Sequence, residues 1–345
     1  MNPPLGVALI GPGSWGRRIA SAVQRSPALR LVCGYSRDES RRQKFAQEFD
    51  CAAAPSFEAV LTRSDVEGVL LVTPNYVHAE QATACAAARK HVFVEKPIAD
   101  TLADGTAMAA ACQAAGVTLL VGHGLRRLGA ARRVKGLLAE GVLGAVVLAE
   151  ANFSLPGTLT PDTWRAHRRT CPGGPLMQLG VHHADTLQYL LGPVVRVHGS
   201  FARLATAAEI DTVAVAALEF AGGARGVITS SYVSPPTYFL RLYGTNAVLE
   251  YHTDMSVWPE AEKMDAATTL ILFTRSGETA VEFDSRDVLV EELEEFTRCA
   301  RGEAHPETGP EEALAALRVV LGAVESHERG AVGTLRPDRP EVAMP

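Results

Sequence analysis

The sequence lacks the cysteine patterns of disulfide-rich and zinc-binding proteins. Its six cysteines stand far apart, and no two of them form a CxxC pair; they are Cys33, Cys51, Cys85, Cys112, Cys171 and Cys299. Neither a structural zinc site nor a disulfide framework is therefore expected. Scattered cysteines are typical of reduced thiols in a cytoplasmic protein, so we predict that location and no bound metal.

The sequence also lacks a long apolar run and an excess of basic residues. No segment approaches the ~20 apolar residues that span a bilayer, and no basic segment precedes the first apolar run, as it would in a signal peptide. The formal net charge is -6, which argues against a nucleic-acid partner. We expect neither a membrane nor a nucleic acid as partner. One local basic cluster predicts either a solvated face or a contact to a ligand phosphate; it consists of Arg126, Arg127, Arg132 and Arg133.

What the sequence does contain is a glycine loop between a strand and a helix at its start. Residues 5–10 are an apolar run that predicts a buried strand, and residues 17–25 have helical composition. Between them lies a G-x-G-x-x-G motif made by Gly11, Gly13 and Gly16. In such a motif the first glycine makes the tight turn, the second lets the backbone approach a pyrophosphate, and the third lets the helix pack on the strand. The alternative is a glycine turn without a ligand. The context predicts dinucleotide binding, with Ser14 and Trp15 at the pyrophosphate.

The order of elements along the 345 residues predicts two domains. In residues 1–123, apolar strands alternate with helices, which indicates an α/β Rossmann-type domain with a parallel sheet. In residues 124–345, successive strand-like runs without intervening helices indicate an α+β domain with a large, mostly antiparallel sheet. We expect one face of that sheet to be covered by helices and the other to form a homodimer or homotetramer interface, because a bare face favours aggregation. The C-terminal helix is a candidate to pack back on the first domain.

The cofactor type is predicted at the end of the second strand. An NAD site usually has an acidic residue there, which binds the ribose hydroxyl. Here Ser36 and Arg37 stand in that place. A hydroxyl and a guanidinium suit a 2′-phosphate, so NADP is preferred over NAD. In the alternative interpretation Arg37 is an exposed loop residue and Asp38 binds the ribose.

Three further segments carry candidate chemistry. Thr73-Pro74-Asn75 and Glu95-Lys96-Pro97 follow predicted parallel strands, at the sheet edge where ligands bind. Farther along, a glycine-rich turn leads into Gly180-x-His182-x-x-Asp185, which places His182 and Asp185 on one helix face. A histidine beside a carboxylate is a natural general base. Taken singly, Lys96 is better explained as a surface lysine, and His182 as the partner in a local hydrogen bond with Asp185.

Three motifs in this order resemble the Gfo/Idh/MocA oxidoreductase family over almost the whole chain: the glycine loop at the start, Glu95-Lys96-Pro97, and the glycine-rich turn leading to Gly180-x-His182-x-x-Asp185. The resemblance implies an NAD(P)-dependent dehydrogenase or reductase that moves hydride between nicotinamide C4 and a secondary alcohol carbon of a sugar, cyclitol or related polyol. It implies that Lys96 binds the reacting oxygen, that His182 is the acid/base, and that Asp185 orients His182 or a substrate hydroxyl, in a cleft between the domains. It also implies a set of cofactor-lining residues: Trp15, Thr73, Pro74, Asn75, His78 and Glu95. Trp164 and Arg165 match a ligand-facing segment more loosely.

Gln178 departs from the family pattern, in which many members carry an aspartate four residues before the histidine. Glutamine forms hydrogen bonds but does not ionise, so the support for a protonated Lys96 or His182 is weaker. The change puts inositol dehydrogenase activity in doubt. Two alternatives therefore stay open: a dehydrogenase of a cyclic cis-diol or hydroxylated carboxylate, held by Arg126, Arg127 or Arg165, and a non-catalytic NADP(H) sensor.

Overall fold

The chain divides into two units in the computed structural model, which describes residues 3–157 and 159–335. Unit 1 contains residues 1–129, 257–266 and 285–314. Unit 2 contains residues 130–256, 267–284 and 315–345. Two late segments therefore join the unit that the first 129 residues form. The last ten residues of the predicted second domain lie outside the described residues.

Unit 1 is built on a six-stranded sheet with strand order β3-β2-β1-β4-β5-β6. All of its strand pairs are parallel, so the predicted Rossmann-type sheet is confirmed. The strands are β1 (Leu5–Ile10), β2 (Leu29–Tyr35), β3 (Ala52–Ala53), β4 (Gly68–Leu71), β5 (His91–Glu95) and β6 (Leu119–Gly122). Every residue of β1 and β4 is buried, which explains why central strands read as continuous apolar runs.

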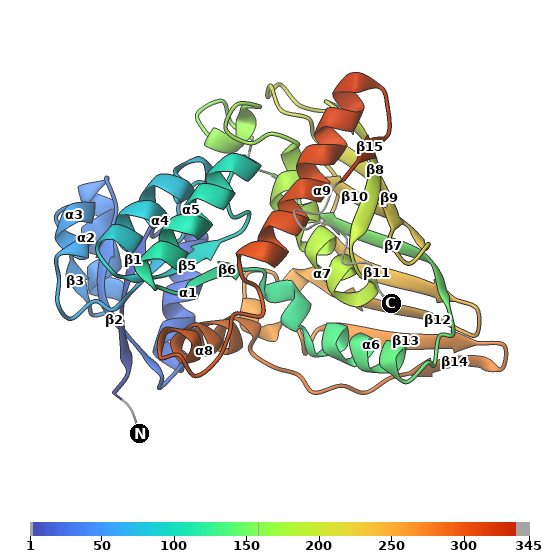
Figure 1. The fold of residues 1–345 in the computed structure, drawn as a ribbon, viewed down its shortest axis with the longest axis horizontal. Helices are drawn as coiled ribbons and strands as arrows, with labels where there is room; N and C mark the ends of the chain where they lie inside the picture. Colours follow the sequence, from blue (N-terminus) through green and yellow to red (C-terminus); the bar gives the residue numbers. More distant parts are fainter. Residues whose placement is uncertain (1–2, 158, 336–345) are drawn as a thin grey trace. The chain divides into compact units, whose positions relative to one another are not determined.

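The α-helices of unit 1 (Figure 1) include α1 (Ser14–Arg25), α2 (Glu39–Glu48), α3 (Phe57–Leu61), α4 (His78–Ala87), α5 (Leu102–Ala115) and α8 (Val288–Ala300). Local sequence sets their ends. Helix α5 begins after Thr101, whose hydroxyl accepts a hydrogen bond from Asp104 N, and it ends at Gly116 in the left-handed conformation. Helix α8 packs on the sheet through Phe296, whose ring meets the edge of Phe93 at 6.1 Å between centroids.

Unit 2 is built on a nine-stranded sheet with strand order β14-β13-β12-β11-β7-β10-β9-β8-β15. Its strand pairs are antiparallel except for β7 with β10, as predicted for this domain. The strands are β7 (Val146–Ser154), β8 (Val194–Ala202), β9 (Val213–Phe220), β10 (Arg225–Ser231), β11 (Thr237–Gly244), β12 (Val248–Thr253), β13 (Thr268–Thr274), β14 (Gly277–Ala280) and β15 (Gly333–Thr334). The short edge strands β14 and β15 were not predicted.

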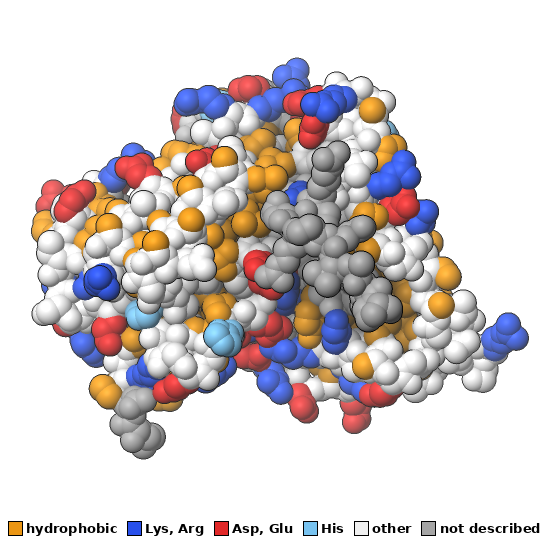
Figure 2. All heavy atoms as spheres, viewed as in Figure 1, with side chains coloured by type: hydrophobic (Ala, Val, Ile, Leu, Met, Phe, Trp, Pro, Cys, Tyr) orange, Lys and Arg blue, Asp and Glu red, His pale blue; other side chains and the backbone are white. Residues whose placement is uncertain are grey.

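The helices of unit 2 gather on one face of this sheet (Figure 1): α6 (Gly129–Ala139), α7 (Val181–Leu191) and most of α9 (Pro310–Arg329). Helix α9 packs tightly against β8. A Cβ on Gly199 of β8 would lie only 2.0 Å from the carbonyl oxygen of Ala323 on α9. Figure 2 shows basic and acidic side chains interspersed on the visible surface. Among the described residues, no helix combines the length and the apolar character needed to cross a membrane.

Candidate functional site

The glycine loop between β1 and α1 has the geometry that phosphate binding requires. Gly11 has φ +91°, and a Cβ there would lie 2.4 Å from Val72 O, so only glycine makes this turn. Gly16 is equally enclosed, since its Cβ would lie 2.4 Å from Gly11 O. At Gly13, by contrast, a Cβ would meet no neighbouring atom within 4 Å. The loop therefore leaves open the one place where a pyrophosphate would approach the backbone.

The first turn of α1 presents its amide groups without a capping side chain. Gly13 is the N-cap residue, and the first turn contains no acidic residue. Within the described part of the chain, the N–H groups of Ser14, Trp15 and Gly16 make no hydrogen bond. Three unpaired amides and the positive end of the helix dipole favour an anion. The loop thus fits the pyrophosphate of a dinucleotide.

Trp15 connects this loop to the end of β5. Its Nε1 donates a hydrogen bond to Glu95 Oε1 over 2.6 Å, and Lys96 N donates to the other carboxylate oxygen over 3.2 Å. Glu95 is only 6% exposed, and burial raises the pKa of its carboxyl, against the opposing effect of the Lys96 charge. Trp15 and Glu95, both predicted to line the cofactor, are therefore in direct contact.

A second tryptophan, Trp258, stacks on Trp15, and no motif predicts this contact. The two rings lie 5.6 Å apart and 20° from parallel, and the Arg18 guanidinium lies 5.1 Å from the first ring and 5.5 Å from the second. Trp258 belongs to the segment 257–266, which is part of unit 1 although it follows strand β12 in sequence. Neither spacing nor composition links residues this far apart.

At the end of β2, Asp38 and Arg37, the two candidates for the ribose site, have different surroundings. The Asp38 carboxylate caps helix α2, accepting a hydrogen bond from Arg41 N at 2.9 Å, and this bond holds the pKa of Asp38 below its usual value. Arg37 is exposed, and its guanidinium has no partner among the described residues. Ser36 accepts a bond from Asp38 N at 3.3 Å. Arg37 is thus available to a ligand, whereas Asp38 is engaged in capping.

The segment Thr73-Pro74-Asn75 is joined to the loop that follows β5. Asn75 Nδ2 donates a hydrogen bond to Asp100, and the His78 ring lies between Thr73 O and Pro97 O. Asn75 and His78 are almost completely buried, at 3% and 1% exposure. The polar atoms of these predicted cofactor residues therefore meet a neighbouring loop in this structure. Lys96 is half-buried in that loop, and its peptide bond to Pro97 is cis.

In unit 2, Gln178, His182 and Asp185 lie on one continuous helical run. A π-helical turn (Leu176–Gly180) leads directly into α7, so the predicted start of the helix at Gly180 falls within helical backbone. All three side chains are buried, at 7%, 5% and 1% exposure. The ring of His182 lies 5.7 Å from that of Phe153 on β7. Spacings of four and three residues place the three side chains on one side of the helix.

The neighbouring His183 has a different environment. Its Nε2 lies 3.0 Å from Asn152 O, and its ring stacks on Tyr238 at 4.8 Å. Burial lowers the pKa of the His183 ring to about 4. A ring this enclosed, and neutral near pH 7, is part of the core of unit 2.

The basic cluster after β6 is not a solvated face. Arg127 is fully buried and forms ion pairs with Glu292, Glu295 and Glu307, and Arg126 donates to the Glu307 carbonyl over 3.2 Å. That prediction was wrong for these two residues, because acidic partners supplied by α8 and the loop after it are distant in sequence. Arg127 is accordingly occupied and is not available to hold a substrate carboxylate.

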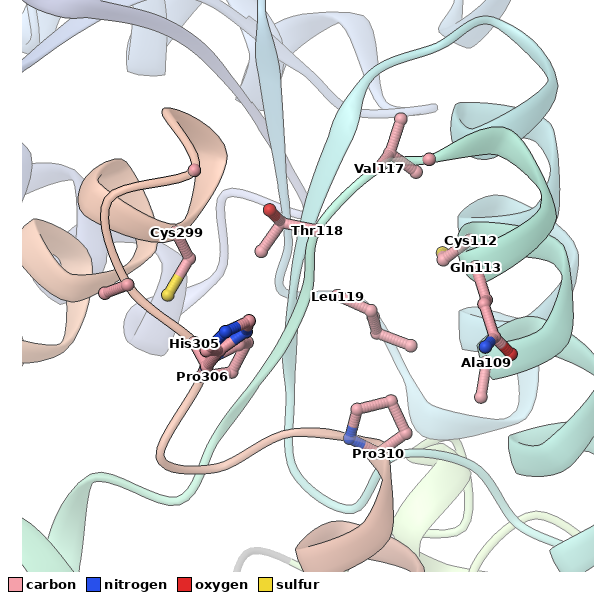
Figure 3. A pocket seen from close by; sticks show the side chains of 13 residues that line it. Ala109, Cys112, Gln113, Val117, Thr118, Leu119, Cys299, His305, Pro306 and Pro310 are labelled. Atoms are coloured by element: carbon pink, nitrogen blue, oxygen red, sulfur yellow. The ribbon is translucent and has the colours of Figure 1, made fainter.

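The structure also contains a groove of about 390 Å³ in unit 1. Figure 3 shows its lining, with Thr118 just before β6 and Cys112 and Cys299 on helices α5 and α8. The groove therefore lies at the amino end of β6, whereas ligands bind at the carboxyl ends of such strands. Burial raises the pKa of both thiols to about 11. No cluster of three or more metal-ligating side chains occurs among the residues described.

Two family models match this chain, one for each predicted domain. Residues 5–123 match an oxidoreductase family with an NAD-binding Rossmann fold, and residues 131–250 match the GFO/IDH/MocA C-terminal domain. The chain is 30% identical to D-xylose 1-dehydrogenase (NADP(+)) 2 of Haloferax volcanii, over 95% of this chain and 97% of that protein. It is 28% identical to 1,5-anhydro-D-fructose reductase of Ensifer adhaerens, over 93% and 96%.

A solved structure from Desulfitobacterium hafniense DCB-2 has the same fold. It superimposes with a TM-score of 0.93 at 38% identity, covering 97% of this chain and 99% of that one. That protein is provisionally named an NADPH-dependent oxidoreductase. The similarity extends over both units.

Proposed function

This chain belongs to the Gfo/Idh/MocA family of NAD(P)-dependent oxidoreductases, and from that premise we propose that it transfers hydride at a secondary alcohol or ketone carbon of a sugar, cyclitol or related polyol. The observation that carries the proposal is the open glycine loop at the amino end of α1, linked through Trp15 and Glu95 to Lys96. The names of two relatives support a sugar, because D-xylose and 1,5-anhydro-D-fructose are both of that class.

The residues at the carboxyl edge of the unit 1 sheet fit a dinucleotide. The amides of Ser14, Trp15 and Gly16 would hold its pyrophosphate, and Ser36 and Arg37 its ribose end. We propose that Thr73, Pro74, Asn75, His78 and Glu95 line the same site, with the hydrogen bonds described above fixing their positions. When bound, the nicotinamide supplies or accepts the hydride.

The side chains of this protein then handle the proton and the oxygen. Lys96 donates a hydrogen bond to the reacting oxygen and stabilises the charge that develops on it. His182 takes the hydroxyl proton during oxidation and returns it during reduction. Asp185 orients the His182 ring or binds a neighbouring substrate hydroxyl, and Gln178 hydrogen-bonds the substrate through its amide.

We propose that NADP is preferred over NAD. An exposed Arg37 without a partner in the described chain suits a 2′-phosphate, and the rival carboxylate of Asp38 is held by the start of α2. Because the Asp38 carboxylate accepts a hydrogen bond from an amide of its own helix, it repels a phosphate less than a carboxylate without such a bond would. The provisional name of the Desulfitobacterium protein and the NADP(+) in the Haloferax name agree with this choice.

Titration of the protein with NADPH and NADH tests the cofactor proposal. We expect NADPH to bind at least about tenfold more tightly, and Arg37→Ala to remove most of that difference while leaving NADH binding unchanged. Arg30→Ala is the matched control, since Arg30 is an exposed arginine near the other end of the same strand. Tighter binding of NADH by the wild-type protein would overturn the proposed preference.

A substrate panel tests the reaction class. Pyranoses, their keto forms and cyclitols should be turned over, whereas turnover of only cyclic cis-diols or hydroxylated aromatic acids would favour that alternative. Binding of NADP(H) without any hydride transfer would favour a sensor.

We also propose that the chain forms a homodimer or homotetramer through the sheet of unit 2. Its helices gather on one face, and strand β9 alternates between buried residues and residues such as Val215, which is 37% exposed. Polar side chains share this second face, where Tyr243 donates to Glu150 over 2.6 Å and Arg241 pairs with Glu250. A mixed apolar and polar face of this kind suits a second copy of the chain.

A further inference from the structure

His78 is the first residue of helix α4, and its ring is enclosed between two loops of unit 1. Nε2 lies 2.9 Å from Thr73 O, which belongs to the same loop as His78 itself. Nδ1 lies 3.1 Å from Pro97 O, which belongs to the loop after β5. The side chain is 1% exposed. The Thr73 contact is therefore local, and the Pro97 contact is the one that joins the two loops.

Both ring nitrogens face a carbonyl oxygen, and this is an unusual demand on a histidine. A carbonyl only accepts hydrogen bonds, and a neutral imidazole has one N–H to donate. Burial lowers the pKa of the ring to about 4, and the nearby Lys96 charge acts in the same direction, so the ring is neutral near pH 7. One contact is then a hydrogen bond, while the other nitrogen meets a carbonyl without a proton between them. An apolar side chain would leave both carbonyl oxygens without a donor, so the one N–H of the ring is what a histidine adds at this position.

The Pro97 carbonyl lies one residue after Lys96. A second hydrogen bond joins the same two loops close to it. Asn75 Nδ2 donates to Asp100, three residues beyond Pro97. On the other side of Lys96, its own amide donates to Glu95. The backbone around Lys96 is thus held by Glu95 before it and by the bond between Asn75 and Asp100 after it, and Nδ1 of His78 contacts Pro97 O between them.

We propose that His78 is a positioning residue for Lys96, acting through the bond between its Nδ1 and the Pro97 carbonyl. The inference rests on the proposed function, in which Lys96 binds the reacting oxygen. A shift of that ammonium by about 1 Å is enough to cost up to 100-fold in rate. His78 does not touch the substrate in this account; it fixes the backbone from which Lys96 extends.

Two substitutions separate the two contacts of the ring. In His78→Asn the amide nitrogen takes the place of Nδ1, so the bond to Pro97 O is kept and the contact to Thr73 O is lost. In His78→Gln the amide nitrogen takes the place of Nε2, so only the local contact to Thr73 O is kept. Asparagine is the smaller residue and leaves the larger void, so a purely structural role predicts that the asparagine variant is the more impaired.

The proposal predicts the opposite order for catalysis. The kcat of His78→Gln should fall at least about tenfold below that of His78→Asn, while the Kd for NADPH differs little between them. The matched control is His91→Gln, because His91 lies at the other end of β5, where its Nδ1 accepts from Thr118 N over 3.1 Å. That variant should lose stability without the loss of kcat. Equal kcat in the two His78 variants, or a lower kcat for the asparagine variant, would overturn the proposal.

A second measurement does not depend on turnover. The rate at which acetic anhydride labels Lys96, followed by mass spectrometry as a function of pH, reports the surroundings of the amine directly. His78→Asn should keep the wild-type profile, and His78→Gln should change it; identical profiles would overturn the proposal. If no sugar is turned over, the proposed function fails while the labelling still tests the role of His78.

Discussion

Asp100 is a half-buried carboxyl whose ionisation opposes folding. Burial raises the pKa of Asp100 to about 6, although the bond from Asn75 acts in the other direction. A carboxyl with a raised pKa in the folded state keeps its proton while the unfolded chain has already lost it. Folding stability should therefore fall as the pH rises from about 4 to about 6, and then stay level.

Asp100→Asn tests this assignment. The variant keeps an oxygen that accepts from Asn75 and cannot ionise, so the difference in unfolding free energy between variant and wild type should shift in favour of the variant across that pH range. Urea unfolding at closely spaced pH values measures it. A difference that stays constant with pH would show that Asp100 ionises normally.

Among the single residues, the roles of Lys96, His182 and Asp185 stay predictions, drawn from motifs whose members are neighbours in sequence. The prediction for Arg127 was wrong because its three acidic partners come from α8 and the segment after it. Trp258 was not predicted for the same reason. Side chains whose role depends on a distant partner carry no local signal, and only the folded chain reveals them.

At the scale of the element, the glycine loop and α1 make a prediction that separates binding from folding. In Gly13→Ala the new methyl group enters open space at an ordinary backbone conformation, so stability should stay within about 0.5 kcal/mol. The same methyl group stands where the pyrophosphate approaches, so NADPH affinity should fall about tenfold or more.

Gly16→Ala is the matched variant, and unlike Gly13→Ala it is expected to lose stability. Its methyl group would lie 2.4 Å from Gly11 O, so the loop must shift and stability should fall by about 1–3 kcal/mol. Thermal unfolding and NADPH titration of both variants provide the comparison. Full affinity in Gly13→Ala would remove the glycine loop from the cofactor site.

The buried ion-pair cluster fixes the turn after β6 to helix α8. Arg127→Met would leave Glu292 and Glu295 buried without their cation, at a cost of about 3–5 kcal/mol. Arg133 pairs with Glu140 on the surface, so Arg133→Met should change stability by no more than about 1 kcal/mol. Denaturant unfolding of the two variants compares them. Similar losses would contradict the structural role of Arg127.

Most elements were predictable because their signals are local. Buried parallel strands are continuous apolar runs, helix ends carry Thr101 and Gly116, and the strands of unit 2 alternate between buried and exposed residues. The two-residue strands β3 and β15 and the exposed β14 were not predictable in this way. They depend on pairing with a neighbour, since their own residues carry little apolar pattern.

At the scale of the whole molecule, the proposed homo-oligomer depends on the open face of the nine-stranded sheet. Val215→Glu places a charge on that face, in strand β9, and should lower the oligomeric state or raise its dissociation constant. Val332→Glu is the control, since Val332 is 50% exposed in the segment before β15. Analytical ultracentrifugation compares them. A monomeric wild-type protein would contradict the proposal.

The central claim concerns unit 1: we propose that its glycine loop holds the cofactor and that its Lys96 acts on the reacting oxygen. Domain boundaries near residue 123 remain a proposal, and the claim does not depend on their exact place. It depends on Lys96 acting in the reaction and not in cofactor binding.

The most direct test is the kcat for hydride transfer between NADPH and a sugar substrate in wild-type and Lys96→Met proteins, together with the Kd for NADPH. Methionine keeps most of the length of the side chain and removes its charge. The account predicts that kcat falls at least about 100-fold while the Kd changes by less than about threefold. An unchanged kcat with weakened NADPH binding would make Lys96 a cofactor ligand and contradict the account.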